Sequence, residues 1–480
     1  MSTFKLYVKT ARLAIPTILE NLFVSVVFLV DALFLAELSE QALAAAGMCS
    51  TVLWRLRSVG GYLQVGIGAY VARRWGQGES HAARLAFTHG CCIGLLIGLL
   101  CVPLYFFTED IFRALRAPDT VLLYILPYFM PIMLVFPLRV ASANMAAALR
   151  ASGDTRTPMI TTITMNLTHI FTNWLLIFGN LGFPKLGIQG AGYSTALAMT
   201  IEFLMLLAVG LRGVRPKRLF QLAPIAAAPA QEDEFQVVSP VYTPAEERDD
   251  VLKLVREGFT LWLKGVSGRI FRVSMPTFWE EIAISAGFMS FIAMIAELGD
   301  DALAAHSSIS RVESFSFNAG FGVSIAASTL VGQALGSGSI REARRAFGAC
   351  FTLVVMLMGT AGLLFAIAPA WFLQWFAGPD SAKFITLAIP LFYLTAIQQP
   401  LIGLTNVLAG GLRGAGQTTP PFIAQMIGVV GVRVGVAYYF AFVRGWGMEG
   451  VYLAMVCDWV MRSTLLGIIV LRGKWEKVVV

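Results

Sequence analysis

The chain has 480 residues, of which 57% are hydrophobic and only 14% are charged, and its formal net charge is +7. A soluble globular protein carries about 25% charged residues, because its surface must stay polar. The composition therefore excludes an ordinary soluble protein and indicates a chain that crosses a lipid bilayer several times.

Twelve apolar segments are long enough to cross a bilayer as helices, which takes about 20 mostly apolar residues. Several of them contain glycine and proline, which are tolerated inside a packed membrane bundle. We therefore predict an all-α polytopic membrane protein with about 12 transmembrane helices. In chain order, the segments are 12–37, 44–72, 84–106, 120–148, 157–179, 189–211, 274–298, 304–335, 346–370, 384–411, 421–443 and 450–471.

Basic residues gather in every second loop between these segments, and acidic residues gather in the remaining loops. Because loops rich in lysine and arginine stay in the cytoplasm, the pattern predicts a multi-pass protein of the inner membrane with both termini cytoplasmic. This bias also explains the net charge, so that no nucleic-acid partner is expected. The basic residues include Arg73, Arg74, Arg84, Arg150, Arg156, Arg341, Arg344 and Arg345, and the acidic ones Glu109, Asp110, Asp300 and Asp301.

Residues 213–250 differ from everything around them, because they are rich in alanine, proline and charged side chains. Such a composition is typical of a solvated linker. An amphipathic stretch follows at 246–271, which we expect to lie on the membrane surface. These features divide the chain into an N-terminal lobe at 1–212 with spans one to six, a cytoplasmic linker at 213–250, and a C-terminal lobe at 251–480 with the amphipathic lead-in helix and spans seven to twelve.

The two lobes repeat each other in sequence. Pro16 and Glu20 return as Pro276 and Glu280, 260 positions later. The loop Gly76-Gln-Gly78 returns at the same offset, as Gly336-Ser-Gly338, and the segment 149–155 returns 263 positions later at 412–418. Each lobe has an even number of spans, so the two have the same orientation and form a pseudo-symmetric pair. Parallel repeats of this kind are a transporter architecture, with the substrate path between the repeats.

These residues resemble the multidrug and toxic compound extrusion (MATE) family. The matching features are Pro16, Glu20 and Asp31 in the first span, the two glycine loops, the Leu-Arg-x-x-Gly-x-Thr-x-x-Pro segments at 149–158 and 412–421, and the run 326–336. The resemblance implies two six-helix lobes around a central cleft, and export of organic, often cationic, compounds by antiport with H⁺ or Na⁺. We therefore expect a multidrug efflux antiporter with no cofactor, acting as a monomer in the bilayer on small organic cations or drugs.

Asp31 interrupts a long apolar run deep in the first span. A carboxylate at such a depth is costly, so it faces the bundle interior or water. A proton or a cation can neutralise it there, which is the chemistry that ion coupling needs. The alternative is a structural pair with a lysine or arginine. Its repeat position is Phe291, and this lack of an acidic counterpart indicates a coupling site in one lobe only.

The resemblance implies that Asp31 acts with polar residues of spans five and six, which are His169, Asn173 and Thr195 in this chain. His169 and Asn173 are four apart on one helix face, and Asn166 lies three residues before His169. Related chains carry Asn or Asp at the first two of these positions, so His169 departs from their pattern. Hard cations prefer oxygen ligands, whereas histidine titrates near neutral pH.

The departure at His169 favours H⁺ over Na⁺ as the coupling ion. If the ion is Na⁺, its ligands are Asp31, Asn173 and Thr195. The alternative role for His169 is an interhelical hydrogen bond.

Glu20, Glu280 and Glu281 are further carboxylates inside apolar segments. Glu20 lies eleven residues before Asp31 and returns to about the same helix face. These acids are candidates for attracting a cationic substrate or relaying protons. The alternative is that Glu20 and Glu280 brace the lobes, which their repetition favours slightly.

Several arginines also fall inside apolar segments, where salt bridges within the bundle are expected. Arg433 is a possible partner of Glu280 or Glu281, and Arg139 is another possible charge partner. Arg55 and Arg57 are expected either to pair within the bundle or to line the cleft or an interface.

Two other functions are alternatives for a chain with this many apolar segments. A lipid-linked oligosaccharide flippase of the same superfamily often has fourteen spans and a basic cavity, whereas this chain has twelve spans and an acidic first helix. A membrane enzyme is not supported, since the chain contains only four histidines and neither a Gly-x-Ser-x-Gly nor a His-Glu-x-x-His motif.

Overall fold

The computed structural model describes residues 3–211, 266–374 and 382–477. These residues are nearly all helical, and ten of the helices are long and apolar enough to cross a membrane. The all-α polytopic fold class is thus confirmed. The predicted linker at 213–250 and most of the amphipathic stretch at 246–271 lie outside the described residues, and the limits of the lobes stay a prediction.

Each of the twelve predicted spans falls on helical residues. In the first half these are α1 (Thr3–Leu38), α2 (Glu40–Gly61), α3 (Leu63–Gly76), α4 (Ser80–Cys101), α6 (Asp119–Ser152), α7 (Arg156–Phe178) and α8 (Ile188–Leu211), with the short α5 (Thr108–Ala114) before α6. In the second half they are α10 (Val266–Glu297), α11 (Asp300–Gly336), α12 (Ile340–Ile367), α14 (Ala382–Gly414), α15 (Thr419–Gln425), α16 (Val434–Tyr438) and α17 (Gly447–Leu471), with the short α13 (Pro369–Gln374) before α14.

Two predicted spans are less regular than the sequence suggested. The second span is split into α2 and α3 next to Gly60 and Gly61, which weaken a helix because glycine has no side chain to restrict the backbone. The eleventh span joins α15 and α16 through π-helical turns at Met426–Arg433 and Tyr439–Val443. Such turns insert an extra residue and are frequent at functional sites.

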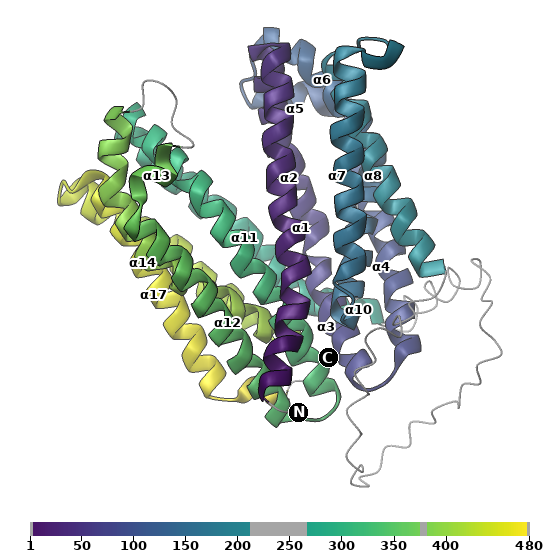
Figure 1. The fold of residues 1–480 in the computed structure, drawn as a ribbon, viewed down its shortest axis with the longest axis vertical. Coiled ribbons are helices and arrows are strands. Elements are labelled where there is room, and N and C mark those ends of the chain that lie inside the picture. The colour runs from purple at the N-terminus through teal and green to yellow at the C-terminus, as the bar shows by residue number, and fades with distance from the viewer. Residues whose placement is uncertain (1–2, 212–265, 375–381, 478–480) are drawn as a thin grey trace.

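The helices form two groups that diverge from a common end, where the N- and C-termini also lie (Figure 1). At this end the first helix of each group packs against a helix of the other group. Helix α1 packs on α11 as well as on α7, and α10 packs on α3. Because α1 with α11 and α10 with α3 are related by the repeat, the two contacts correspond to each other across a pseudo-two-fold axis.

Gly76 and Gly336, which are repeat-related, touch each other at this axis. A Cβ added at Gly336 would lie 3.1 Å from the Cα of Gly76. Nearby, Thr329 donates a hydrogen bond to the Arg150 carbonyl at 3.1 Å, and the Gln333 amide donates to the Ala151 carbonyl at 2.9 Å. The common end of the bundle is therefore closed by backbone contacts that only glycine permits and by hydrogen bonds between the halves.

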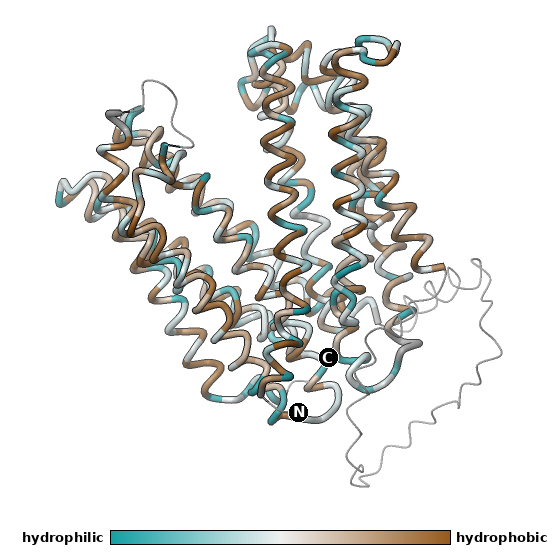
Figure 2. Tube along the Cα trace, in the orientation of Figure 1, coloured by the Kyte–Doolittle hydropathy of each residue, from teal (hydrophilic) through white to brown (hydrophobic). Residues whose placement is uncertain are grey.

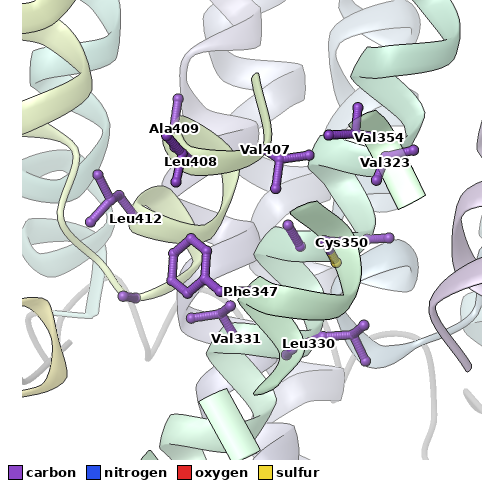
Figure 3. Close-up of a cluster of buried hydrophobic side chains, with 14 of the residues drawn as sticks. Val323, Leu330, Val331, Phe347, Cys350, Val354, Val407, Leu408, Ala409 and Leu412 are labelled. Carbon is purple, nitrogen blue, oxygen red and sulfur yellow. The ribbon is translucent and has the colours of Figure 1, made fainter. Parts of the chain in front are cut away.

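Buried apolar side chains hold each group of helices together. Figure 3 shows one such cluster, in which residues from α11, α12 and α14 interdigitate around Phe347 and Cys350. Large apolar side chains also cover the outside, such as Leu100, which is 78% exposed. Figure 2 shows that apolar residues predominate along the long helices. An outer surface of this kind suits contact with lipid tails rather than water.

Candidate functional site

Asp31 lies in the last third of α1, two turns before its C-terminal end, on the side that packs against α7. Its carboxylate is 24% exposed and faces the side chains of His169 and Asn173. These two residues are one helical turn apart, so their side chains point the same way from α7. The packing of α1 on α7 therefore assembles the three residues from positions far apart in the sequence.

A side-chain nitrogen lies close to each oxygen of the Asp31 carboxylate. The Asn173 amide nitrogen donates to Oδ1 at 2.7 Å, and Nδ1 of His169 lies 3.4 Å from Oδ2. The same amide nitrogen lies 3.2 Å from Nε2 of His169. Asn173 is almost fully buried, so its orientation is fixed by these contacts and by the surrounding helices.

Thr195 of α8 completes the group. Its hydroxyl lies 3.0 Å from Nε2 of His169 and donates to the Ala191 carbonyl at 2.9 Å. Tyr128 of α6 shares a hydrogen bond with Thr195 and lies within electrostatic range of Asp31. Four helices of the N-terminal half thus contribute to one polar cluster around Asp31, and Tyr128 is a member that the sequence did not suggest.

Asn166 lies two turns from Asn173 on α7 and is buried. None of its hydrogen bonds within the described residues reaches Asp31, and its amide nitrogen has no partner there. Four of the five predicted residues therefore lie together, and Asn166 lies apart from them.

The cluster is poorly arranged for a sodium ion as it stands. Na⁺ requires several oxygen ligands, whereas nitrogen donors face both oxygens of Asp31. The Asn173 amide oxygen is buried and has no hydrogen-bond partner among the described residues. A rotation of that amide would be needed before Asp31, Asn173 and Thr195 could offer oxygens to one ion.

Glu20 and Glu280 form matching ion pairs. Glu20 of α1 lies 3.0 Å from Arg150 of α6, and Glu280 of α10 lies 2.5 Å from Arg413 of α14. Both partners are repeat-related, since Arg150 and Arg413 belong to the Leu-Arg segments at the ends of their helices. Thr162 also donates to Glu20 at 3.2 Å. The geometry is that of a brace between helices, and a role in substrate attraction or proton relay stays a prediction.

Arg433 has a different partner from those that the sequence suggested. Arg433 lies 2.7 Å from Asp458 of α17, not beside Glu280 or Glu281, and Arg462 also contacts Asp458 at 2.5 Å. The suggested pairing is wrong because Arg413 already occupies Glu280. The Arg433 guanidinium also lies 5.6 Å from the ring centroid of Phe291.

Arg139 pairs with Glu202 of α8 at 2.5 Å. The Thr162 hydroxyl lies 3.2 Å from Glu202 as well as from Glu20, so its single hydrogen is shared between the two carboxylates. Glu202 is the one charged residue of the sixth predicted span, so the signal that singled out Asp31 could also have found it, whereas its partner follows from the packing of α6 on α8.

Arg55, Arg57 and Glu281 behave differently from these pairs. Within the described residues, none of the three has an ion-pair partner within 4 Å. The expectation that Arg55 and Arg57 form salt bridges in the bundle is therefore wrong. Glu281 instead lies within electrostatic range of both arginines.

A second polar cluster in the C-terminal half was missed. Glu313 of α11 accepts a hydrogen bond from Gln398 of α14 at 2.8 Å, and Ser316 donates to Gln399 at 2.7 Å. Glu313 lies in the apolar span 304–335, so the same signal that singled out Asp31 could have found it.

The chain matches the sequence profile of the MatE family twice, at residues 16–175 and 276–439. The matches start at Pro16 and Pro276 and so follow the internal repeat. Among curated relatives, a probable multidrug resistance protein NorM of Thermotoga maritima is 28% identical over 480 aligned residues, covering 97% of this chain and 92% of the relative. A protein of the same name from Agrobacterium fabrum is 23% identical, covering 97% of this chain and 93% of the relative.

Solved transporters share the fold. An outward-facing multidrug resistance MATE transporter of the MOP superfamily superposes with a TM-score of 0.80 at 18% identity, over 98% of this chain and 96% of the other. The eukaryotic MATE transporter AtDTX14 superposes with a TM-score of 0.78 at 16% identity, over 99% and 97%. Two repeats that match the family profile and a two-lobe bundle of the same shape lead to one conclusion, that the chain belongs to the MatE family of multidrug transporters.

Proposed function

We propose that the protein exports small organic compounds, cationic ones among them, in exchange for H⁺, with Asp31 as the carboxylate that takes up the ion. The observation that carries the proposal is the cluster of Asp31 with His169 and Asn173, because a carboxylate at this depth is retained at a cost. Relatives that span nearly the whole chain are named multidrug resistance proteins, which supports efflux as the overall activity.

The choice of H⁺ over Na⁺ rests on the atoms that surround the carboxylate. Both oxygens of Asp31 face nitrogen groups, which are hydrogen-bond donors and not ligands for a hard cation. A proton needs no set of oxygens, and it can be shared between the Asp31 carboxylate and the His169 ring. Loss of the charge on Asp31 would weaken the hydrogen bond from Asn173 and so loosen α1 from α7.

Sodium is the competing coupling ion. A rotation of the Asn173 amide would turn its unpartnered oxygen toward Asp31, and the Thr195 hydroxyl lies close to the same group. Three oxygens would then be available from Asp31, Asn173 and Thr195, and water would have to supply the others.

We further propose that the protein acts as a monomer in the cytoplasmic membrane with both termini in the cytoplasm. The basic loops support this orientation. They lie at the end where Gly76 and Gly336 close the bundle, so the helices diverge toward the outside of the cell.

The test uses purified protein in lipid vesicles that contain a fluorescent organic cation. Export is followed under a pH gradient alone and under a sodium gradient alone. We expect the pH gradient to drive export and the sodium gradient to have no effect. Export driven only by sodium would reverse the choice of ion, and no export under either gradient would contradict the proposed function.

A further inference from the structure

Helices α3 and α10 are packed in a defined antiparallel register that continues toward α2. A Cβ at Gly66 would lie 2.5 Å from the Ile270 carbonyl oxygen. Further along, the rings of Tyr62 and Phe278 meet at 5.3 Å between centroids. Continuing this register by one more turn brings residue 57 of α2 opposite residue 281 of α10.

The repeat-related interface between α1 and α11 has the same register. Gly322 lies against Ile18, which is the counterpart of the contact between Tyr62 and Phe278. One turn further, the Asn318 amide donates a hydrogen bond to the Ser25 hydroxyl at 3.1 Å. The interface between α1 and α11 thus continues as ordinary packing. In the corresponding region, the interface of α10 with α2 and α3 contains Arg57 and Glu281 instead.

The surroundings of Arg57 come from both halves of the molecule. Its guanidinium is within electrostatic range of Arg139 on α6, Glu202 on α8 and Glu281 on α10. Arg57 is nonetheless exposed. A side chain that is exposed but surrounded by charges from three other helices lies in a space between those helices, not on the lipid-facing side of α2.

The charges near this space do not balance. Arg139 is neutralised by Glu202, and Glu280 is neutralised by Arg413. Of the charges just named and Arg55, those without an ion-pair partner within the described ranges are Arg55, Arg57 and Glu281. Two positive charges therefore face one negative charge, and one positive charge remains uncompensated.

These three charges also have no counterpart in the repeat. The positions 260 residues after Arg55 and Arg57 are Phe315 and Phe317, and the position 260 residues before Glu281 is Asn21. By contrast, the ion pairs of Glu20 and Glu280 are present in both halves. Charges kept in one half only are not required by the scaffold.

We infer that Arg57 of α2, facing Glu281 of α10, forms a subsite for the carboxylate group of an exported organic compound. Arg55 leaves α2 on another side and adds positive charge within electrostatic range of the same site. This inference rests on the proposed efflux function, since it names a compound class for the same transport path. Guanidinium groups suit a carboxylate because their N–H groups match its two oxygens. Glu281 competes with the compound for the arginines, so a weakly held carboxylate can be released again when the halves move.

The experiment compares rhodamine B, which has a free carboxylate, with its ethyl ester, which does not. Binding to the full-length protein in lipid nanodiscs is measured by fluorescence anisotropy without any ion gradient. We expect the acid to bind more tightly than the ester. Arg57→Gln should lower the ratio of acid to ester affinity about tenfold, since a charge-assisted hydrogen bond is lost. Glu281→Gln, which removes the competing carboxylate, should raise the ratio.

Arg341→Gln serves as the matched control, because Arg341 is an exposed arginine at the start of α12 and should leave the ratio unchanged. Equal affinities for acid and ester, or an unchanged ratio in both Arg57→Gln and Glu281→Gln, would overturn the inference. Efflux is a separate measurement. Export of the ester with no preference for the acid would reject the subsite alone, whereas preferential binding of the acid without export of either compound would reject the efflux function alone.

Discussion

Gly76 and Gly336 lie against each other at the closed end of the bundle, although they are 260 residues apart and belong to different halves. Two equivalent residues can touch only at the axis that relates their repeats. This contact therefore marks the position of the pseudo-two-fold axis and the place where the halves must separate if this end opens.

Replacing Gly336 with alanine should open this end. The new methyl group would collide with the Arg73 carbonyl, and overpacking of this kind costs about 1–3 kcal/mol. Spin labels at Gln77 and Arg341, in a protein with its cysteines replaced, should move apart in double electron–electron resonance measurements. Gly68→Ala is the control, because a Cβ there meets nothing within 4 Å. Unchanged distances in Gly336→Ala would contradict the prediction.

Removing Arg413 should destabilise the protein more than removing Arg150. Each change leaves a carboxylate without its partner, which costs about 3–5 kcal/mol when the carboxylate is buried. The Glu280 side chain is only 2% exposed and that of Glu20 is 12% exposed, so the larger loss is expected at Arg413. Thermal unfolding of the detergent-purified Arg413→Gln and Arg150→Gln proteins provides the measurement. Adding Glu280→Gln to Arg413→Gln should restore much of the lost stability, and failure to do so would argue against the ion pair.

Asp31→Asn should reduce ion-driven export to the background level while the protein stays folded. The replacement can still accept the hydrogen bond from Asn173, but it can no longer gain and lose a charge. Export from vesicles and the unfolding midpoint are measured together. Glu37→Gln, an exposed acid in the last turns of the same helix, should export normally. Full export by Asp31→Asn would remove Asp31 from the coupling mechanism.

His169→Asn should shift the driving ion from H⁺ toward Na⁺. The change replaces a ring nitrogen with an amide that can turn its oxygen toward Asp31, which favours a hard cation. Export is compared under a pH gradient and under a sodium gradient, as for the native protein. A variant that keeps its pH drive and gains none from sodium would assign His169 to helix packing instead.

Much of the helical architecture followed from the sequence because the bilayer imposes it. A span must be a long apolar helix, and paired signals such as Pro16 with Pro276 survive as a repeat in the sequence. The cluster of Asp31 with His169, Asn173 and Thr195 could also be predicted, because each member is polar in an apolar span and resembles a known pattern.

Ion-pair partners could not be predicted in the same way. Arg433 reaches Asp458 because of how α17 packs on the π-helical segment, and Arg139 reaches Glu202 because α6 packs on α8. Such choices depend on the rotation of each helix about its axis, which apolar spans specify only weakly. Glu313, by contrast, could have been recognised from the sequence, because it is a carboxylate inside an apolar span.

The contact of Arg433 with Phe291 has a consequence for the electrical behaviour of transport. Phe291 is the repeat counterpart of Asp31. Where the first half holds a carboxylate that can change charge, the second half holds an aromatic ring that contacts a permanent cation.

If one H⁺ enters per cycle at Asp31, exchange for a singly charged cation moves no net charge. Exchange for a compound without net charge moves one elementary charge inward, which a membrane potential of 100 mV favours by about 2.3 kcal/mol. The dependence of efflux on voltage would then report the charge of the compound carried.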